Sequence, residues 1–361
     1  MIYSNLLLRF LSNSSHCQSV LRMLLLLINA ITGIALWIEV SSGCRIVVMR
    51  DKRSRPEDQV SVTFDPRRLI MPIFISHQRD AAFPAPGMSG VLHLGIDRAV
   101  EYVGMCADSG IREFIVFGLD SPEKDSMALK ASSPDSPVCA AIRELSSSFP
   151  DSRFWGHVTL AHYTDHGGNF CLGKDGQVDW EHTTGRFCEI CKVLAESGAG
   201  IVLPFLLRQG AISSIRSFLE GNGLLNTEVY SYGAKFRSSF YGPFNRSTGV
   251  TEISKGDLQL EPSDKQGALE KIKNDVSEGS KGIVIKPALP YLDIIASAGS
   301  VTKLPLVAYM VSGEYMMLKH AGADGIADGR RSMLEAHLSI FRAGADMVIT
   351  YNALDLLKSG S

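Results

Sequence analysis

Short apolar runs, rich in β-branched and aromatic residues, recur along the chain and alternate with longer segments that show helical periodicity. Several runs are almost continuously hydrophobic, which is typical of strands buried on both faces of a parallel sheet. Eight strands, each followed by a segment long enough for a helix, predict an α/β fold of the closed (β/α)8 TIM-barrel type. The predicted strands are residues 69–75, 113–118, 154–160, 201–204, 228–232, 283–285, 306–311 and 347–351.

The same pattern divides the chain into three parts. No internal repeat, low-complexity tract or evident linker interrupts the later alternation, so we expect residues 65–361 to form one barrel domain. Residues 46–64 are predicted to form an N-terminal arm. Residues 1–45 contain an uncharged, mostly apolar run, 23–38, which is short for a membrane span. We interpret residues 1–45 as a signal-like extension, an arm or an artefact of the gene model, and we leave membrane association open.

Charge and cysteine content exclude several classes of protein. The chain carries 36 Lys and Arg residues and 38 Asp and Glu residues, and it contains no long basic run, which argues against nucleic acid as a partner. Its seven cysteines are odd in number and scattered, which argues against a disulfide framework and favours a reducing compartment. Cys188 and Cys191 form a lone C-x-x-C motif in a predicted helix. Without a second Cys or His pair at zinc spacing, we expect two half-buried thiols there.

Two lysines lie where the predicted barrel would place its active site, at the carboxyl ends of strands. Lys235 follows the fifth predicted strand and Lys286 ends the sixth. Burial and a neighbouring cation lower the pKa of a lysine, so that its amine can attack a carbonyl and form a Schiff base. A single lysine at a strand end more often extends its ammonium toward water, but two on adjacent strands favour a catalytic pair. Ser312 and Tyr351 close the seventh and eighth strands, and their hydroxyls are candidate ligands for a substrate carboxylate.

Longer motifs surround these residues: SYGAKF at 231–236, SFYGPF at 239–244, IKP at 285–287, PYLDI at 290–294 and VSGEY at 311–315. Together they resemble the porphobilinogen synthase family, also called delta-aminolevulinic acid dehydratase. The resemblance implies a cytosolic lyase of haem biosynthesis that condenses two molecules of 5-aminolevulinate to porphobilinogen. It also implies a homo-oligomer, usually an octamer, in which Lys286 binds the propionate-side substrate and Lys235 the acetate-side substrate, each as an imine.

The chain departs from this family at positions that hold metal in many of its members. The three zinc-binding cysteines of the family align with Thr159, Ala161 and Asn169, none of which suits a soft, closed zinc site. A nearby aspartate of the family aligns with His157. The glutamate that binds an allosteric magnesium aligns with Lys271, so we expect neither metal site to be retained and no cofactor is certain.

The pocket for the acetate-side substrate also departs from the family. The loop after the fourth strand reads PFLLRQGA at 204–211 where the family has PSDMMDGR, so a serine, two aspartates and an arginine are replaced. Of the two arginines that bind the acetate-side carboxylate in the family, one aligns with Asn245, next to Arg246, and the other with Lys255. A lysine offers a point charge where an arginine offers a planar pair of donors, so we expect weaker capture of the carboxylate.

Two functions remain open at this point. The first is a working porphobilinogen synthase, in which Arg246, Lys255 or Arg208 compensates for the replaced arginines. The second is a catalytically degenerate homologue that binds ligand or regulates an oligomeric partner, and an apolar wall at Phe205 and Leu206 would favour it. A Schiff-base aldolase shares the barrel and the lysine chemistry but needs only one lysine.

A replacement metal site is a further alternative. His157, His162, His166 and Cys171 lie within one short segment, and imidazole and thiolate groups suit zinc. Their spacing matches no standard pattern, so we expect hydrogen-bonded or solvated loop histidines instead.

Overall fold

The structure is a computed structural model that describes residues 35–41, 44–50, 64–249 and 259–358. The chain divides into two units, residues 1–65 with 359–361, and residues 66–358. In the first unit, β1 (Ala35–Ser41) pairs with β2 (Cys44–Arg50) in an antiparallel register. Most of the apolar run that ends at residue 38 lies outside the described residues.

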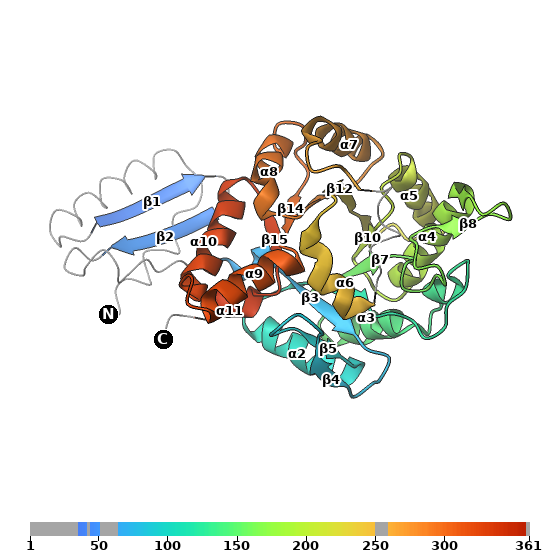
Figure 1. Ribbon diagram of the computed structural model, residues 1–361, viewed down its shortest axis with the longest axis horizontal. Coiled ribbons are helices and arrows are strands. Elements are labelled where there is room, and N and C mark those ends of the chain that lie inside the picture. The colour runs from blue at the N-terminus through green and yellow to red at the C-terminus, as the bar shows by residue number, and fades with distance from the viewer. Residues whose placement is uncertain (1–34, 42–43, 51–63, 250–258, 359–361) are drawn as a thin grey trace. The chain divides into compact units, whose positions relative to one another are not determined.

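Parallel strands form the centre of the second unit and confirm the predicted TIM barrel (Figure 1). Neighbouring strands follow the order β11-β10-β7-β6-β3-β15-β14-β13-β12. Their carboxyl ends meet at one end of the barrel. The bounds are β3 (Leu69–Ile75), β6 (Glu113–Gly118), β7 (Arg153–Val158), β10 (Ile201–Pro204), β11 (Glu228–Val229), β12 (Ser231–Lys235), β13 (Ile283–Lys286), β14 (Leu306–Tyr309) and β15 (Met347–Ile349).

The fifth predicted strand is divided into two short strands that close the ring. β11 pairs with β10, whereas β12 pairs with β13. Between them, the backbone N–H of Tyr230 donates to the carbonyl of Val202, and the N–H of Ser231 donates to the carbonyl of Gly282. The chain therefore changes partner at Tyr230, and the two halves together connect the fourth strand of the barrel with the sixth.

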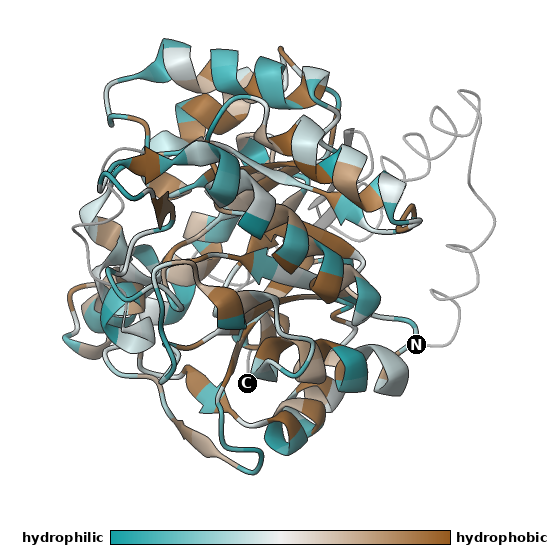
Figure 2. Ribbon diagram, turned by 90° about the vertical axis from the view of Figure 1, so that its right-hand side faces the viewer, coloured by the Kyte–Doolittle hydropathy of each residue, from teal (hydrophilic) through white to brown (hydrophobic). Residues whose placement is uncertain are grey.

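Helices surround the strands, and their buried residues recur at helical spacing, as in α2, where Ile96, Ala99, Val103 and Cys106 are buried. Figure 2 shows the resulting alternation of hydrophilic and hydrophobic segments along the helices. The helices are α2 (Ile96–Asp108), α3 (Pro137–Ser148), α4 (Trp180–Glu196), α5 (Ala211–Gly221), α6 (Gly242–Thr248), α7 (Lys265–Ser277), α8 (Leu292–Ala298), α9 (Ser312–Ala323), α10 (Gly329–Arg342) and α11 (Ala353–Leu357).

Shorter elements that the periodicity did not predict decorate the barrel. Two antiparallel strand pairs lie in the loops, and single 3-10 turns precede several helices and strands. These elements are β4 (Ala82–Pro84), β5 (Leu92–Leu94), β8 (Cys171–Leu172), β9 (Val178–Asp179), η2 (Pro66–Arg68), η3 (Leu129–Ser132), η4 (Ser239–Tyr241) and η7 (Leu289–Tyr291).

The two thiols of the C-x-x-C motif lie in the interior of the protein. Cys188 and Cys191 lie in α4 and are buried rather than half-buried, and burial raises the pKa of the Cys188 thiol to about 11.

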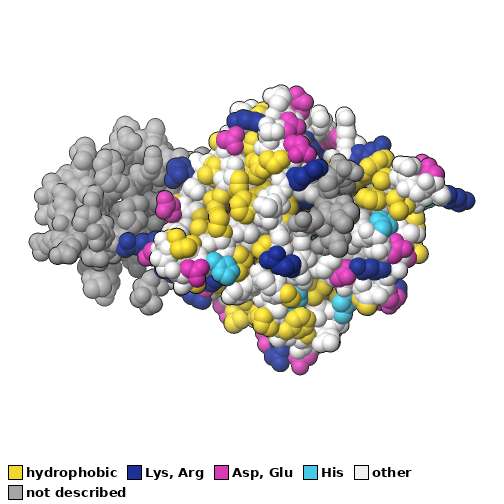
Figure 3. Space-filling model, viewed as in Figure 1, with side chains coloured by type: hydrophobic (Ala, Val, Ile, Leu, Met, Phe, Trp, Pro, Cys, Tyr) yellow, Lys and Arg dark blue, Asp and Glu magenta, His cyan; other side chains and the backbone are white. Residues whose placement is uncertain are grey.

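On the face drawn in Figure 3, the Lys and Arg side chains of the described residues are scattered among acidic and apolar ones. Within the described ranges, no helix has the length and apolarity that a membrane span requires.

Candidate active site

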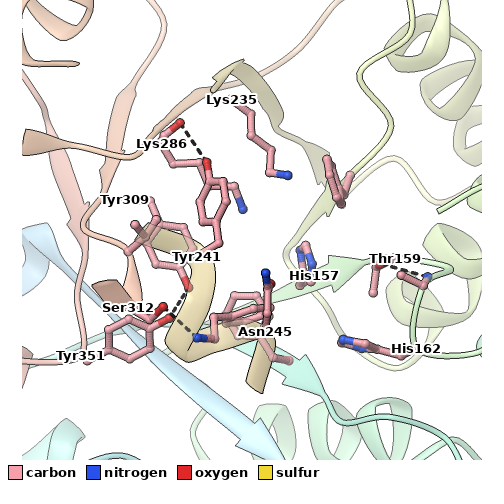
Figure 4. Close-up of a pocket in the computed structure, with 15 residues that line it drawn as sticks. His157, Thr159, His162, Lys235, Tyr241, Asn245, Lys286, Tyr309, Ser312 and Tyr351 are labelled. Atoms are coloured by element: carbon pink, nitrogen blue, oxygen red, sulfur yellow. Dashed lines mark hydrogen bonds between the residues drawn. The ribbon is translucent and has the colours of Figure 1, made fainter. Parts of the chain in front are cut away.

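Lys235 and Lys286 are direct partners at the ends of β12 and β13. The parallel register places Lys235 opposite Lys286, and their side chains retain only 3% and 8% of their exposure. Both line one cavity at the carboxyl ends of the strands (Figure 4). The other described residues that line it are Phe117, His157, Thr159, Ala161, His162, Phe205, Tyr241, Phe244, Asn245, Tyr309, Val311, Ser312 and Tyr351.

Aromatic rings pack around both lysine amines. The Nζ atom of Lys286 lies 3.9 Å from the centroid of the Tyr232 ring, and the Nζ atom of Lys235 lies 3.3 Å from that of Phe205. The centroid of the Tyr241 ring lies 5.2 Å from the Nζ atom of Lys235 and 5.9 Å from that of Lys286. Ring faces attract a cation and also exclude water, so these rings place the amines in a poorly hydrated environment where a carbonyl can be attacked.

A buried carboxylate holds the loop that follows Lys286. Glu314, at the start of α9, is fully buried and accepts hydrogen bonds from the backbone N–H groups of Ala288, Leu289 and Val311, at 3.1, 2.5 and 2.7 Å. Burial raises the pKa of Glu314 to about 7, although the backbone donors act in the opposite direction. Glu314 therefore connects the ends of β13 and β14. Lys286 at the end of β13 and Val311 after β14 both line the cavity.

Ser312 and Tyr351 lie in the same cavity as the lysines, as the sequence predicted. The hydroxyl of Ser312 accepts a hydrogen bond from the backbone N–H of Phe244 at 2.9 Å. The hydroxyl of Tyr351 lies 2.8 Å from that of Tyr309, a hydrogen bond that Figure 4 shows beside the lysines. Burial raises the pKa of the Tyr351 phenol well above its ordinary value, so it remains a hydrogen-bond donor at neutral pH.

The structure does not place Arg246 among the described residues that line this cavity. Arg246 is exposed on α6 and packs toward Gly87, whereas its neighbour Asn245 is buried and lines the cavity. Successive residues of a helix point about 100° apart, so only one of the two can face the lysines. Lys255 lies outside the described residues.

A second cavity adjoins the first and contains Arg208. Its described lining includes Lys235, Arg208, Lys271 and Gln259. The guanidinium of Arg208 lies 5.5 Å from the ring of Trp180. Lys235 lines both cavities.

Of the apolar wall predicted for the loop after β10, Phe205 lines the cavity of the two lysines, whereas Leu206 is not among the residues of its lining. Phe205 and Leu206 are buried, at 5% and 2% exposure. The ring of Phe205 covers the amine of Lys235, and Arg208 lines the adjoining cavity, so a cationic side chain and an apolar ring both occur near this lysine.

The residues at the family's zinc positions do not fit a zinc site. The carboxamide oxygen of Asn169 accepts hydrogen bonds from the Thr159 hydroxyl at 2.9 Å and from the Leu160 N–H at 2.6 Å, and its amide nitrogen donates to the Phe205 carbonyl. The side chain of Ala161 has no atom that could bind a metal ion. A set of a hydroxyl, a methyl group and an engaged amide lacks the thiolates and imidazoles that zinc requires.

The histidines of the loop after β7 make other contacts in the structure. His166 stacks on Phe170, and its Nδ1 atom accepts the backbone N–H of Gly168. Across the described part of the chain, no three His, Cys, Asp or Glu side chains converge on a point that could hold a metal ion. The ammonium of Lys271 pairs with Asp275 at 2.8 Å, on α7.

Sequence reasoning missed two residues that line this cavity, Tyr241 and Tyr309, and two that contact its lining residues, Tyr232 and Glu314. Tyr232, Tyr241 and Glu314 lie within the motifs that carried the family resemblance, and Tyr309 lies in a predicted strand. Their presence inside those motifs was the available signal. Without the fold they were indistinguishable from core residues, because aromatic residues in apolar segments usually pack in the interior.

Comparison with known proteins identifies the family of this chain. The family model described as delta-aminolevulinic acid dehydratase matches residues 47–359. The chain belongs to this family. The delta-aminolevulinic acid dehydratase of Mycobacterium leprae is 36% identical over 297 residues, which cover 81% of this chain and 90% of that protein. That of Candida glabrata is 37% identical over 290 residues, covering 78% and 85%.

A solved structure of a dehydratase shares the whole barrel. The enzyme of Toxoplasma gondii ME49, in complex with the reaction product porphobilinogen, superposes with a TM-score of 0.78 at 34% identity. The match covers 84% of this chain and 86% of that chain. The predicted dehydratase family and the predicted barrel are both confirmed.

Proposed function

We propose that this chain is a porphobilinogen synthase that condenses two molecules of 5-aminolevulinate to porphobilinogen with loss of water. The observation that carries the proposal is the register of Lys235 opposite Lys286, with both side chains buried at one cavity. An amine adds to a ketone, and loss of water leaves an imine. Because each lysine can hold one substrate, the site brings together two molecules that would otherwise have to meet in solution.

The polar groups around each lysine suggest how the substrates are held. Next to Lys286, the hydroxyls of Ser312, Tyr309 and Tyr351 supply donors for the carboxylate of the first substrate. Next to Lys235, Arg208 in the adjoining cavity supplies the charge for the carboxylate of the second. In this proposal Arg208, and not Arg246, compensates for the arginines of the family.

The proposal includes no step through the family's metals. Thr159, Ala161 and Asn169 leave zinc without suitable ligands, and Lys271 is a cation where the family places a magnesium-binding carboxylate. The proposal also includes a cytosolic homo-oligomer, as is usual in the family. Scattered cysteines agree with a reducing compartment, and sedimentation of the full chain tests the oligomer.

The decisive experiment measures porphobilinogen formed by the purified full chain at saturating 5-aminolevulinate, with and without added zinc or magnesium. Lys286→Ala removes the amine of the first imine. Lys265→Ala is the matched control, because Lys265 is a half-exposed surface lysine paired with Asp293. Product that disappears only in Lys286→Ala supports the proposal, whereas absence of product from the unaltered chain under every condition refutes it.

One observation favours a second candidate, a degenerate homologue that binds a single aminolevulinate. The ring of Phe205 lies against the Lys235 amine and occupies space beside it. Reduction with borohydride followed by peptide mass analysis separates the candidates. A synthase gives adducts on both lysines during turnover, whereas the degenerate homologue gives an adduct on Lys286 alone and no pyrrole.

A further inference from the structure

The cavity around the lysines contains no carboxylate among the described residues that line it. Imine formation still requires proton transfer, because the ketone oxygen leaves as water only after it has gained a proton. Besides Lys235, which the proposed function assigns to the second imine, the titratable described side chains that line the cavity with Lys286 are its tyrosines and histidines.

The phenols of the site are unsuited to this role. Tyr232, Tyr241, Tyr309 and Tyr351 are all buried, and burial raises the pKa of each phenol well above its ordinary value. They hold their protons at neutral pH and act as hydrogen-bond donors. Glu314 does not line the cavity, and its carboxylate is occupied by backbone N–H groups.

His157 is held in place on the cavity wall at the end of β7. Its ring lies 4.7 Å from that of Phe117, and its Nδ1 atom lies 3.1 Å from the Tyr232 hydroxyl. The ring of Tyr232 in turn covers the Lys286 amine at 3.9 Å. Figure 4 shows the side chains of His157, Lys286 and Lys235 directed into the same space. The other histidine of the lining, His162, lies in the loop beyond β7.

We propose that His157 is the catalytic acid and base of imine formation at Lys286, an inference that rests on the proposed function. The neutral lysine amine adds to the substrate ketone, and the new carbinolamine carries the former carbonyl oxygen as a hydroxyl. The imidazolium of His157 protonates this hydroxyl, the carbon–oxygen bond breaks, and water leaves. The nitrogen lone pair forms the C=N bond, and the N–H proton returns to the imidazole.

This sequence of transfers predicts a bell-shaped dependence of imine formation on pH. The rate rises as the lysine loses its proton and falls as His157 loses its proton. Tyr232 of β12 contacts the ring of His157. The other titratable groups that line the cavity with His157 are His162, Lys235, Tyr241, Lys286, Tyr309 and Tyr351. Replacement of His157 should remove the decrease in rate at high pH, which depends on the histidine, and leave the increase in rate with pH, which depends on the lysine.

The test measures the rate at which 5-aminolevulinate becomes trapped on Lys286 by borohydride, in rapid-quench samples analysed by mass spectrometry between pH 5 and pH 9. The variants are His157→Gln, which keeps a hydrogen-bonding group for Tyr232, and His157→Ala, with and without added imidazole. His166→Gln is the matched control, because His166 lies in the same segment but does not line the cavity. His162→Gln tests the other histidine.

We expect His157→Gln to slow trapping about 100-fold or more, the lower end of what a positioned acid or base contributes. Imidazole should restore part of the rate to His157→Ala, and His166→Gln should match the unaltered protein. Trapping at the unaltered rate in His157→Gln, or a loss confined to His162→Gln, overturns the inference.

The same experiment distinguishes failure of the inference from failure of the proposed function. An unaltered protein that makes pyrrole, together with a His157→Gln variant that traps normally, overturns the inference alone. An unaltered protein that traps substrate but makes no pyrrole overturns the synthase proposal. In that case, the trapping rates of the unaltered protein and of His157→Gln still test the role of His157. An unaltered protein that traps nothing overturns both.

Discussion

The buried carboxylate of Glu314 predicts a specific dependence of stability on pH. Burial raises its pKa from 4.5 to about 7 in the folded chain. Below pH 4.5 the folded and unfolded chains both hold the proton. Between pH 4.5 and 7 the unfolded chain releases it first, so the free energy of unfolding decreases as pH rises. The total decrease is about 3 kcal/mol, because each pKa unit corresponds to about 1.36 kcal/mol.

Replacement of Glu314 by Gln isolates this contribution. Glutamine keeps the shape but does not titrate, so the difference in unfolding free energy between the two proteins should decrease by about 3 kcal/mol from pH 4.5 to above pH 7. Urea unfolding at matched protein concentration, followed by tryptophan fluorescence, measures it. Glu335→Gln is the control, because Glu335 is exposed on α10. A pH profile of Glu314→Gln parallel to that of the unaltered protein would refute the reasoning.

Further predictions concern the groups around the site. Asn169→Ala removes a carboxamide with three hydrogen-bond partners, so it should lower the free energy of unfolding by about 1–3 kcal/mol in urea. Arg208→Ala should raise KM for 5-aminolevulinate about tenfold, whereas the exposed control Arg79→Ala should not. In the folded protein, iodoacetamide at pH 7.5 should leave Cys188 and Cys191 unmodified, since burial raises the pKa of both thiols, and mass analysis should find both labelled only after unfolding.

The hydrophobic pattern located the barrel strands because each is short, apolar and separated from the next by a helix. Strands β3, β6 and β10 begin and end at the predicted residues, whereas β7, β14 and β15 end two residues earlier than predicted. The chain remains buried after its last ladder pair, as at Met310 and Val311, so an apolar pattern cannot mark the end of pairing. Where the fifth strand divides, the ring of Tyr230 packs closely against Gly282, a contact between residues distant in sequence that an apolar pattern does not reveal.

The sequence could predict that a residue lies at the site where the order of the strands alone determines the position of that residue. Lys235 and Lys286 end adjacent strands of a parallel barrel, so their proximity follows from the fold. Arg246 could not be placed in this way, because the sequence does not define which side of the short helix α6 faces the cavity. His157 was noted as a departure from the family, but its link to Lys286 through Tyr232 is a contact across the barrel.

The register of Lys235 opposite Lys286 also limits how the proposed condensation can evolve. Neighbouring strands in a sheet are about 4.8 Å apart, a spacing set by backbone hydrogen bonds and independent of side-chain identity. Two substrates attached to these lysines are therefore anchored one strand apart, whatever residues occupy the surrounding loops. Substitutions in the loops, such as those at Phe205 and Arg208, can alter the affinity for substrate and the rate of the reaction. The hydrogen bonds between the two strands keep the distance between the two lysine backbones constant.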